Sequence, residues 1–188
     1  LSSSMVSIYV FTSKLAFLIC TTLVSKIPAA IFPGMSILFE NKEEQKIVDI
    51  FQKLTVVCLR IGVVFATIYF IYNEEFIRLW IGKEYYGGKQ LTIIFTIWIF
   101  IESLVRGITS ILFSSNQIAG WSFISGIEAV INLFLSITLI DNYGLLGIAI
   151  ATILSRLLTT VIFVPIKICK IIGFSFKRYF YDTILFTL

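Results

Sequence analysis

The sequence contains no histidine and few charged residues. Histidine is the side chain whose charge changes near neutral pH and is a common metal ligand, and none of the 188 residues is one. Charged residues make up 14% of the chain, against about a quarter in soluble domains. The composition therefore excludes imidazole bases and histidine-bound metals, and it argues against a soluble enzyme.

Other signs of catalysis are also missing. The three cysteines, Cys20, Cys58 and Cys169, lie far apart, without the spacing of metal ligands, so we expect them to serve in packing. No glycine-rich phosphate loop is present. We therefore predict no catalytic residues, no bound metal and no cofactor, and the chain is not expected to be an enzyme.

What the sequence does contain is long apolar runs. Hydrophobic residues make up 58% of the chain, and its mean hydropathy is +0.97. A helix of ~20 apolar residues crosses the ~30 Å hydrocarbon core of a bilayer. We predict an all-α, polytopic transmembrane bundle that forms a single domain over 1–188. The expected spans are about 5–39, 54–72, 91–113, 119–140 and 145–168, with the start of another at 179–188.

The connections between these runs are short and polar. Pro28 and Pro33 are expected to break the first span, and 43–52 should form a short amphipathic helix that leads into the second. Aromatic and charged residues mix over 73–88, which is typical of a membrane interface. The tight turns near 114–117 and 141–144 should make the third, fourth and fifth spans antiparallel.

The basic residues between the spans predict the orientation of the chain. With a net charge of +4, they indicate contacts with membrane lipids, and no nucleic acid is expected. By the positive-inside rule the richer side is cytoplasmic, which places the start of the first span outside. The cytoplasmic side would carry Lys42, Lys46, Lys53, Lys167, Lys170, Lys177 and Arg178, and the other side Arg78, Lys83 and Lys89.

Charged residues inside the spans are the candidates for function. Each costs roughly 2.5 to 3.5 kcal/mol near a helix centre, so it needs a partner, a wet cavity or a route to the surface. Arg156 lies near mid-span, with Glu102 or Glu128 as the partner nearest in depth. The excess of basic residues favours an anionic substrate. The residues concerned are Lys14, Lys26, Arg60, Glu102, Arg106, Glu128 and Arg156.

For each candidate, a structural role stands beside a functional one. Glu102 and Arg106 are four residues apart, so they can pair on one helical face and merely lower the cost of insertion. Asn132 can join helices or contact a substrate, and Glu102 or Glu128 could couple transport to H⁺ or Na⁺. The residues expected to line a substrate cavity are Lys14, Lys26, Arg60, Arg106, Asn132 and Arg156.

Five segments, in this order, resemble a known family, and the last is the most specific. They are Tyr9 in Val-Ser-Ile-Tyr, 33–36 (Pro-Gly-Met-Ser), 79–85 (Leu-Trp-Ile-Gly-Lys-Glu-Tyr), Glu128 to Asn132 with Leu133, and 143–152 (Tyr-Gly-Leu-Leu-Gly-Ile-Ala-Ile-Ala-Thr). Together they resemble the later half of the Wzx-type polysaccharide flippases, which export O-antigen and capsule units. These belong to the multidrug/oligosaccharidyl-lipid/polysaccharide transporter superfamily. The turn at 115–117 departs from the family pattern.

The resemblance implies a MATE-like second bundle, a fragment of a longer transporter whose N-terminal bundle would be its partner. Its implied work is to flip a polyprenyl-diphosphate-linked oligosaccharide from the cytoplasmic to the outer leaflet of the bacterial inner membrane, by alternating access around a cationic cavity. Three alternatives remain open. They are a drug or metabolite antiporter of the same fold, a membrane-embedded glycan polymerase, and a membrane scaffold in which every buried charge is structural.

Overall fold

The computed structural model describes residues 3–116 and 118–184, and these residues form helices joined by short connections. Five of the helical stretches are long and apolar enough to cross a membrane, which confirms the predicted all-α, multi-span architecture. The helices are α1 (Ser3–Leu18), η1 (Ile19–Val24), α2 (Lys26–Glu40), α3 (Glu44–Trp80), η2 (Lys83–Tyr85), α4 (Gly88–Ser114), α5 (Ile118–Tyr143), α6 (Leu145–Leu158), α7 (Thr160–Ile171) and α8 (Phe176–Ile184).

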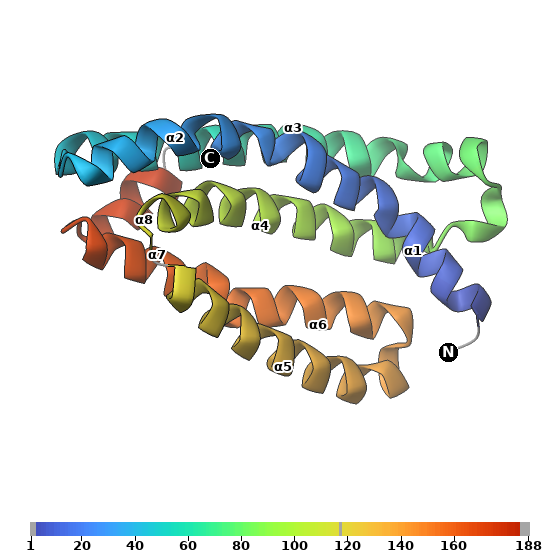
Figure 1. The fold of residues 1–188 in the computed structure, drawn as a ribbon. Helices are drawn as coiled ribbons and strands as arrows, with labels where there is room; N and C mark the ends of the chain where they lie inside the picture. Colours follow the sequence, from blue (N-terminus) through green and yellow to red (C-terminus); the bar gives the residue numbers. More distant parts are fainter. Residues whose placement is uncertain (1–2, 117, 185–188) are drawn as a thin grey trace.

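The helices run back and forth along one axis, with α4 at the centre (Figure 1). The α1–α2 stretch and α3 cover one side of α4, while α6 and α7 cover the other. The expected antiparallel arrangement of α4, α5 and α6 is present, but α6 lies next to α4 and α5 lies outside α6. As a result, α4 is the most buried span, and α5 presents a largely uncovered apolar face that includes Phe123, Val130 and Phe134.

The first span breaks earlier than its prolines predict. A π-helical segment, η1, occupies Ile19–Val24, and the Ser25 amide bonds to the Cys20 carbonyl, five residues back. Pro28 cannot donate to the carbonyl four residues before it, and its ring crowds that carbonyl, so the distortion falls on the turn that precedes it. The Ser25 hydroxyl donates to the Thr21 carbonyl in place of the amide. Pro33 lies inside α2 without ending it, so the predicted second break is wrong.

The second span is one unbroken helix of 37 residues. The expected lead-in helix is continuous with it, and the segment after Tyr72 stays helical as far as Trp80, which corrects both predicted boundaries. At 1.5 Å per residue, α3 is about 55 Å long, so both of its ends extend beyond a ~30 Å hydrocarbon core. Apart from Arg60, the charged residues of the helix lie toward those ends, which explains why the apolar run alone underestimated its length.

The fifth span is two helices. The run of apolar residues over 145–168 predicts one helix, but the backbone breaks at Thr159, where φ is −114° and ψ is −86°, between α6 and α7. Pro165 lies inside α7 and does not end it. Further along, α8 returns toward α3, where the Tyr179 ring stacks on Phe51 with 4.5 Å between the ring centroids. The predicted start of a sixth span, 179–188, falls partly on α8. Residues 185–188 of it lie outside the described residues.

Small residues allow α3 and α4 to pack closely. An added Cβ at Gly62 of α3 would meet Cβ and Oγ of Ser103 at 2.5 Å, and one at Gly107 of α4 would meet Thr55 Cα at 3.2 Å. Gly147 on α6 faces the backbone of Leu139 on α5 in the same way. Glycines at these places let helix backbones approach, as expected for helix packing inside a membrane.

A buried polar network joins three helices at the end of the bundle that carries η2. The Tyr69 hydroxyl donates to the Thr12 carbonyl at 2.9 Å, and the Asn73 amide donates to the hydroxyl oxygens of Tyr69 and Thr92 at 3.1 and 3.2 Å. The Gly87 amide donates to the Thr12 hydroxyl oxygen at 2.8 Å. This network holds α1, α3, α4 and the connection before α4 together, so these ends form one unit.

Candidate functional site

Four charged side chains from three helices meet between α4, α5 and α6. Arg156, in the last turn of α6, contacts Glu102 of α4 and Glu128 of α5, with N···O distances of 2.5 and 2.6 Å. Glu102 also pairs with Arg106, four residues along α4, at 2.9 Å. The partners expected for Arg156 are therefore both present, and the expected pairing of Glu102 with Arg106 is also found. We call Glu102, Arg106, Glu128 and Arg156 the charge cluster.

Glu102 is the centre of the cluster. Its side chain is 3% exposed, and both carboxylate oxygens are used. Oε1 accepts from Arg106 Nε, while Oε2 accepts from Arg156 Nε at 3.2 Å and Nη2 at 2.5 Å. A buried carboxylate needs partners of this kind, because an unpaired charge in an apolar interior costs several kcal/mol. Glu102 therefore serves first to neutralise two arginines inside the bundle.

Glu128 is held from both sides of the α6–α7 break. Its Oε1 accepts from Arg156 Nη1 at 2.6 Å. Its Oε2 accepts from the hydroxyls of Thr159, at 2.9 Å, and of Thr160. Since every contact is a donor, the geometry suits an ionised carboxylate.

The charge cluster is balanced, with two acids against two bases. The side chain of Arg156 is 21% exposed and that of Glu128 is 15% exposed, so most of the cluster is shielded. Arg106 is the exception, with 34% of its side chain exposed. Arg106 is therefore the member of the cluster that can reach something outside it.

Asn132 joins α5 to α6. Its amide nitrogen donates to the hydroxyl oxygens of Thr152, at 3.3 Å, and Ser155, at 3.2 Å. The residue lies one turn beyond Glu128 on α5, so α5 carries one polar stripe that faces α6. Of the two roles considered for Asn132, these bonds match the one that joins helices.

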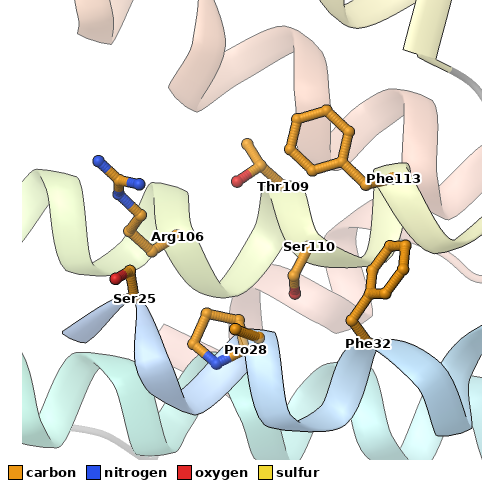
Figure 2. Close-up of a pocket in the computed structure, with 8 residues that line it drawn as sticks. Ser25, Pro28, Phe32, Arg106, Thr109, Ser110 and Phe113 are labelled. Atoms are coloured by element: carbon orange, nitrogen blue, oxygen red, sulfur yellow. The ribbon is translucent and has the colours of Figure 1, made fainter. Parts of the chain in front are cut away.

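Arg106 lines a cavity of about 290 Å³ between α2 and α4 (Figure 2). Ser25 lies on the same side of the cavity as Arg106, and Phe32 and Phe113 lie at the other end. The cavity therefore has a cationic, hydroxyl-bearing end and an aromatic end. Its lining residues are Ser25, Pro28, Ala29, Phe32, Arg106, Thr109, Ser110 and Phe113.

The break in the first span shapes this cavity. Ser25, which ends η1, and Pro28, in the first turn of α2, both belong to its wall. In the described hydrogen bonds Arg106 donates only through Nε, to Glu102, and Figure 2 shows its guanidinium directed away from α2. The two terminal nitrogens are thus placed to meet an acceptor from outside the cluster.

Three of the predicted cavity residues lie elsewhere. Lys14 of α1, Lys26 of α2 and Arg60 of α3 are exposed, and none makes an ion pair within residues 3–116 and 118–184. Long basic side chains on exposed faces can reach the headgroup region, so these positions match the surface role that was weighed for them.

Sequence reasoning missed Thr159 and Thr160. A signal was available, because they follow Arg156 by three and four residues and so belong to the same helical face. Hydroxyls on the face of a buried arginine can complete the coordination of its acidic partner. The sequence pattern could not reveal that the helix breaks at Thr159.

The described part of the chain offers no metal site of the usual kind. It contains no group of three or more acids or cysteines that could hold a metal ion. Cys20, Cys58 and Cys169 are buried and free, as expected for packing residues.

Comparison of the chain with protein families, with curated proteins and with solved structures gives no match. The described structure by itself establishes a helical protein with five candidate membrane spans.

Proposed function

We propose that this chain is part of a membrane transporter that moves an anionic, lipid-linked substrate between leaflets, namely a polyprenyl-diphosphate-linked oligosaccharide. The observation that carries the proposal is Arg106, a basic side chain inside a span that lines a cavity and whose terminal nitrogens make none of the described hydrogen bonds. A guanidinium is well suited to phosphate oxygens, which it can bind with two parallel hydrogen bonds.

The cavity suits a substrate that is both charged and apolar. Its polar end combines Arg106 with hydroxyl side chains, and its other end presents Phe32 and Phe113. A diphosphate headgroup would meet the cation, while a polyprenyl chain would pass along the aromatic and apolar side. An organic cation, the substrate class of the antiporter alternative, would be repelled by Arg106 and would find no free carboxylate, because Glu102 and Glu128 are both fully paired.

The sequence resemblance to polysaccharide flippases supports the same substrate class. Under this proposal the chain works in the bacterial inner membrane, in polysaccharide biosynthesis, with an N-terminal bundle of the same protein completing the cavity. The two bundles would rock about the substrate to expose it to each leaflet in turn.

The test is to delete the gene in its host and measure lipid-linked oligosaccharide on each leaflet, together with surface polysaccharide. Complementation with the wild-type gene should restore outer-leaflet units, whereas Arg106→Gln should leave finished units on the cytoplasmic leaflet. Arg106→Gln suits this test because Glu102 keeps its two bonds to Arg156, so the protein should still be produced.

The matched control is Arg60→Gln, which removes an exposed arginine from a neighbouring span and should transport normally. Full transport by Arg106→Gln, produced at normal levels, would remove Arg106 from substrate binding. Units that reach the outer leaflet but stay unpolymerised in the deletion strain would indicate the polymerase instead, and an unchanged glycan would indicate small-molecule export or a scaffold.

A further inference from the structure

The α6–α7 break is a weak point in the backbone ladder of the fifth span. The Thr159 amide bonds back to Ser155, and the Ile162 and Phe163 amides bond to the Thr159 carbonyl. Thr159 itself is not helical, and its φ of −114° and ψ of −86° depart from the α-helical values of about −63° and −42°. At such an interruption, the angle between α6 and α7 can change more readily than within a continuous helix.

Side chains bridge the break. Glu128 of α5 binds Arg156 before the break, Thr159 at the break and Thr160 after it. One carboxylate therefore ties the end of α6 and the beginning of α7 to a third helix.

The two threonines are not equivalent. The Thr159 hydroxyl has a second acceptor within reach, the Ser155 carbonyl at 2.6 Å, so it keeps a partner when Glu128 is withdrawn. The Thr160 hydroxyl has Glu128 as its only acceptor among the described hydrogen bonds. Thr160 is thus the side chain that couples α7 to the carboxylate.

The charges around Glu128 make this tie depend on its ionisation. Arg156 of α6 contacts Glu128 directly and links it to Glu102 of α4, which also pairs with Arg106. Lys167 of α7 lies farther away, against Gly120, and Glu128 is the only charged residue of α5 besides Asp141. The ionised carboxylate of Glu128 accepts from Arg156 and from both threonine hydroxyls. A neutral Glu128 carries a proton that it must donate, so at least one of these hydrogen bonds has to be reversed or lost.

We propose that Thr159 and Thr160 position Glu128 as a carboxylate latch across the α6–α7 break, and that α7 changes its angle to α6 when Glu128 is neutral. The latch concerns the conformation of the chain and does not depend on which substrate is bound. An experiment can therefore contradict the latch and leave the proposed function intact, or contradict the proposed function and leave the latch intact.

The experiment measures distances between spin labels in the full protein in lipid nanodiscs. One label replaces Phe134 on α5 and the other Phe163 on α7, both of which are exposed. Thr159→Val/Thr160→Val keeps the shape of both residues and removes the hydroxyls, and Glu128→Gln removes the charge. Both variants should shift or broaden the distance distribution relative to the parent.

Two controls accompany this measurement. Thr138→Val removes a hydroxyl that bonds only to the backbone of α5 and should leave the distribution unchanged. A second label pair at Val64 on α3 and Ile97 on α4 reports whether the rest of the bundle is intact, and should not change. If Glu128→Gln changes the distance between the second pair of labels, the proposal is judged on the threonine variant alone, because that variant removes no charge. Distributions that superimpose on the parent in the threonine variant would overturn the proposal.

Discussion

The position of Arg156 shows how a single charged residue constrains three helices. Its guanidinium donates to carboxylates on α4 and α5 from the last turn of α6, so its removal would leave Glu128 facing two hydroxyls and no cation. Breaking a buried ion pair by deleting one partner costs about 3–5 kcal/mol, since the other charge stays buried and unpaired.

We therefore expect Arg156→Gln to destabilise the protein by about 3 kcal/mol or more. The double variant Arg156→Gln/Glu128→Gln should be more stable than the single one, because Glu102 and Arg106 then remain as a balanced pair. Unfolding in mixed micelles would measure both. A double variant less stable than Arg156→Gln would show that charge balance does not govern the cluster.

At the scale of the element, the observed helices bend and end at other residues than the spans predicted from the apolar runs. The break in the first span falls on η1, one turn before Pro28, while Pro33 and Pro165 are accommodated inside helices. In η1 the Ser25 amide bonds to the Cys20 carbonyl, and the Thr21 carbonyl accepts from the Ser25 hydroxyl instead. Proline alone therefore does not decide which turn is distorted.

Alanine substitutions should have different effects on stability at Gly62, which lies in the contact between α3 and α4, and at Gly126, which lies on the uncovered helix α5. Gly62→Ala would place a Cβ 2.5 Å from Ser103, which should destabilise the protein by about 1–3 kcal/mol through overpacking. Gly126→Ala, on α5, meets no atom within 4 Å and should be neutral or stabilising by up to about 1 kcal/mol from helix propensity. Thermal unfolding in the same detergent would compare them, and equal effects would show that α3 and α4 do not pack as described.

At the scale of the whole molecule, the alternating direction of the helices places the basic residues that lie between the spans at the two opposite ends of the bundle. The connections at 41–43 and 172–175 lie together, since residues of both line one pocket with Ile47 and Ile171 nearby. The 81–87 connection is at the other end, where α3 finishes (Figure 1). The richer end carries Lys42, Lys46, Lys170 and Lys177, so the positive-inside rule predicts that this end is cytoplasmic.

Cysteine labelling would test that orientation. Lys83→Cys should react with a membrane-impermeant maleimide in intact cells, whereas Lys46→Cys should react only after the membrane is opened. Both lysines are exposed, and the native cysteines are buried, so the parent protein provides the background. The reverse pattern would invert the topology, and labelling of both from one side would contradict the arrangement of α3.

Much of this molecule follows from sequence because the bilayer is a simple constraint. An apolar run of the required length must be a helix, since no water is available to satisfy its backbone, and this determined the number of spans and their alternating direction. The partners of Arg156 could also be predicted from the sequence, because buried charges at the same depth in the membrane need to pair. The ends of α3 could not be predicted, because its charged terminal turns extend beyond the apolar core.

The sequence by itself therefore determined an all-helical chain with five membrane-length segments, and which charges those segments carry. Only the tertiary structure decided that α6 rather than α5 lies beside α4 and that Arg106 rather than Lys14, Lys26 or Arg60 lines the cavity. It also decided that Glu128 binds residues on both sides of the α6–α7 break. The reason is physical: the cost of burying a charge depends on depth, which sequence position encodes, whereas its partners depend on how helix faces are rotated against one another, which packing alone establishes.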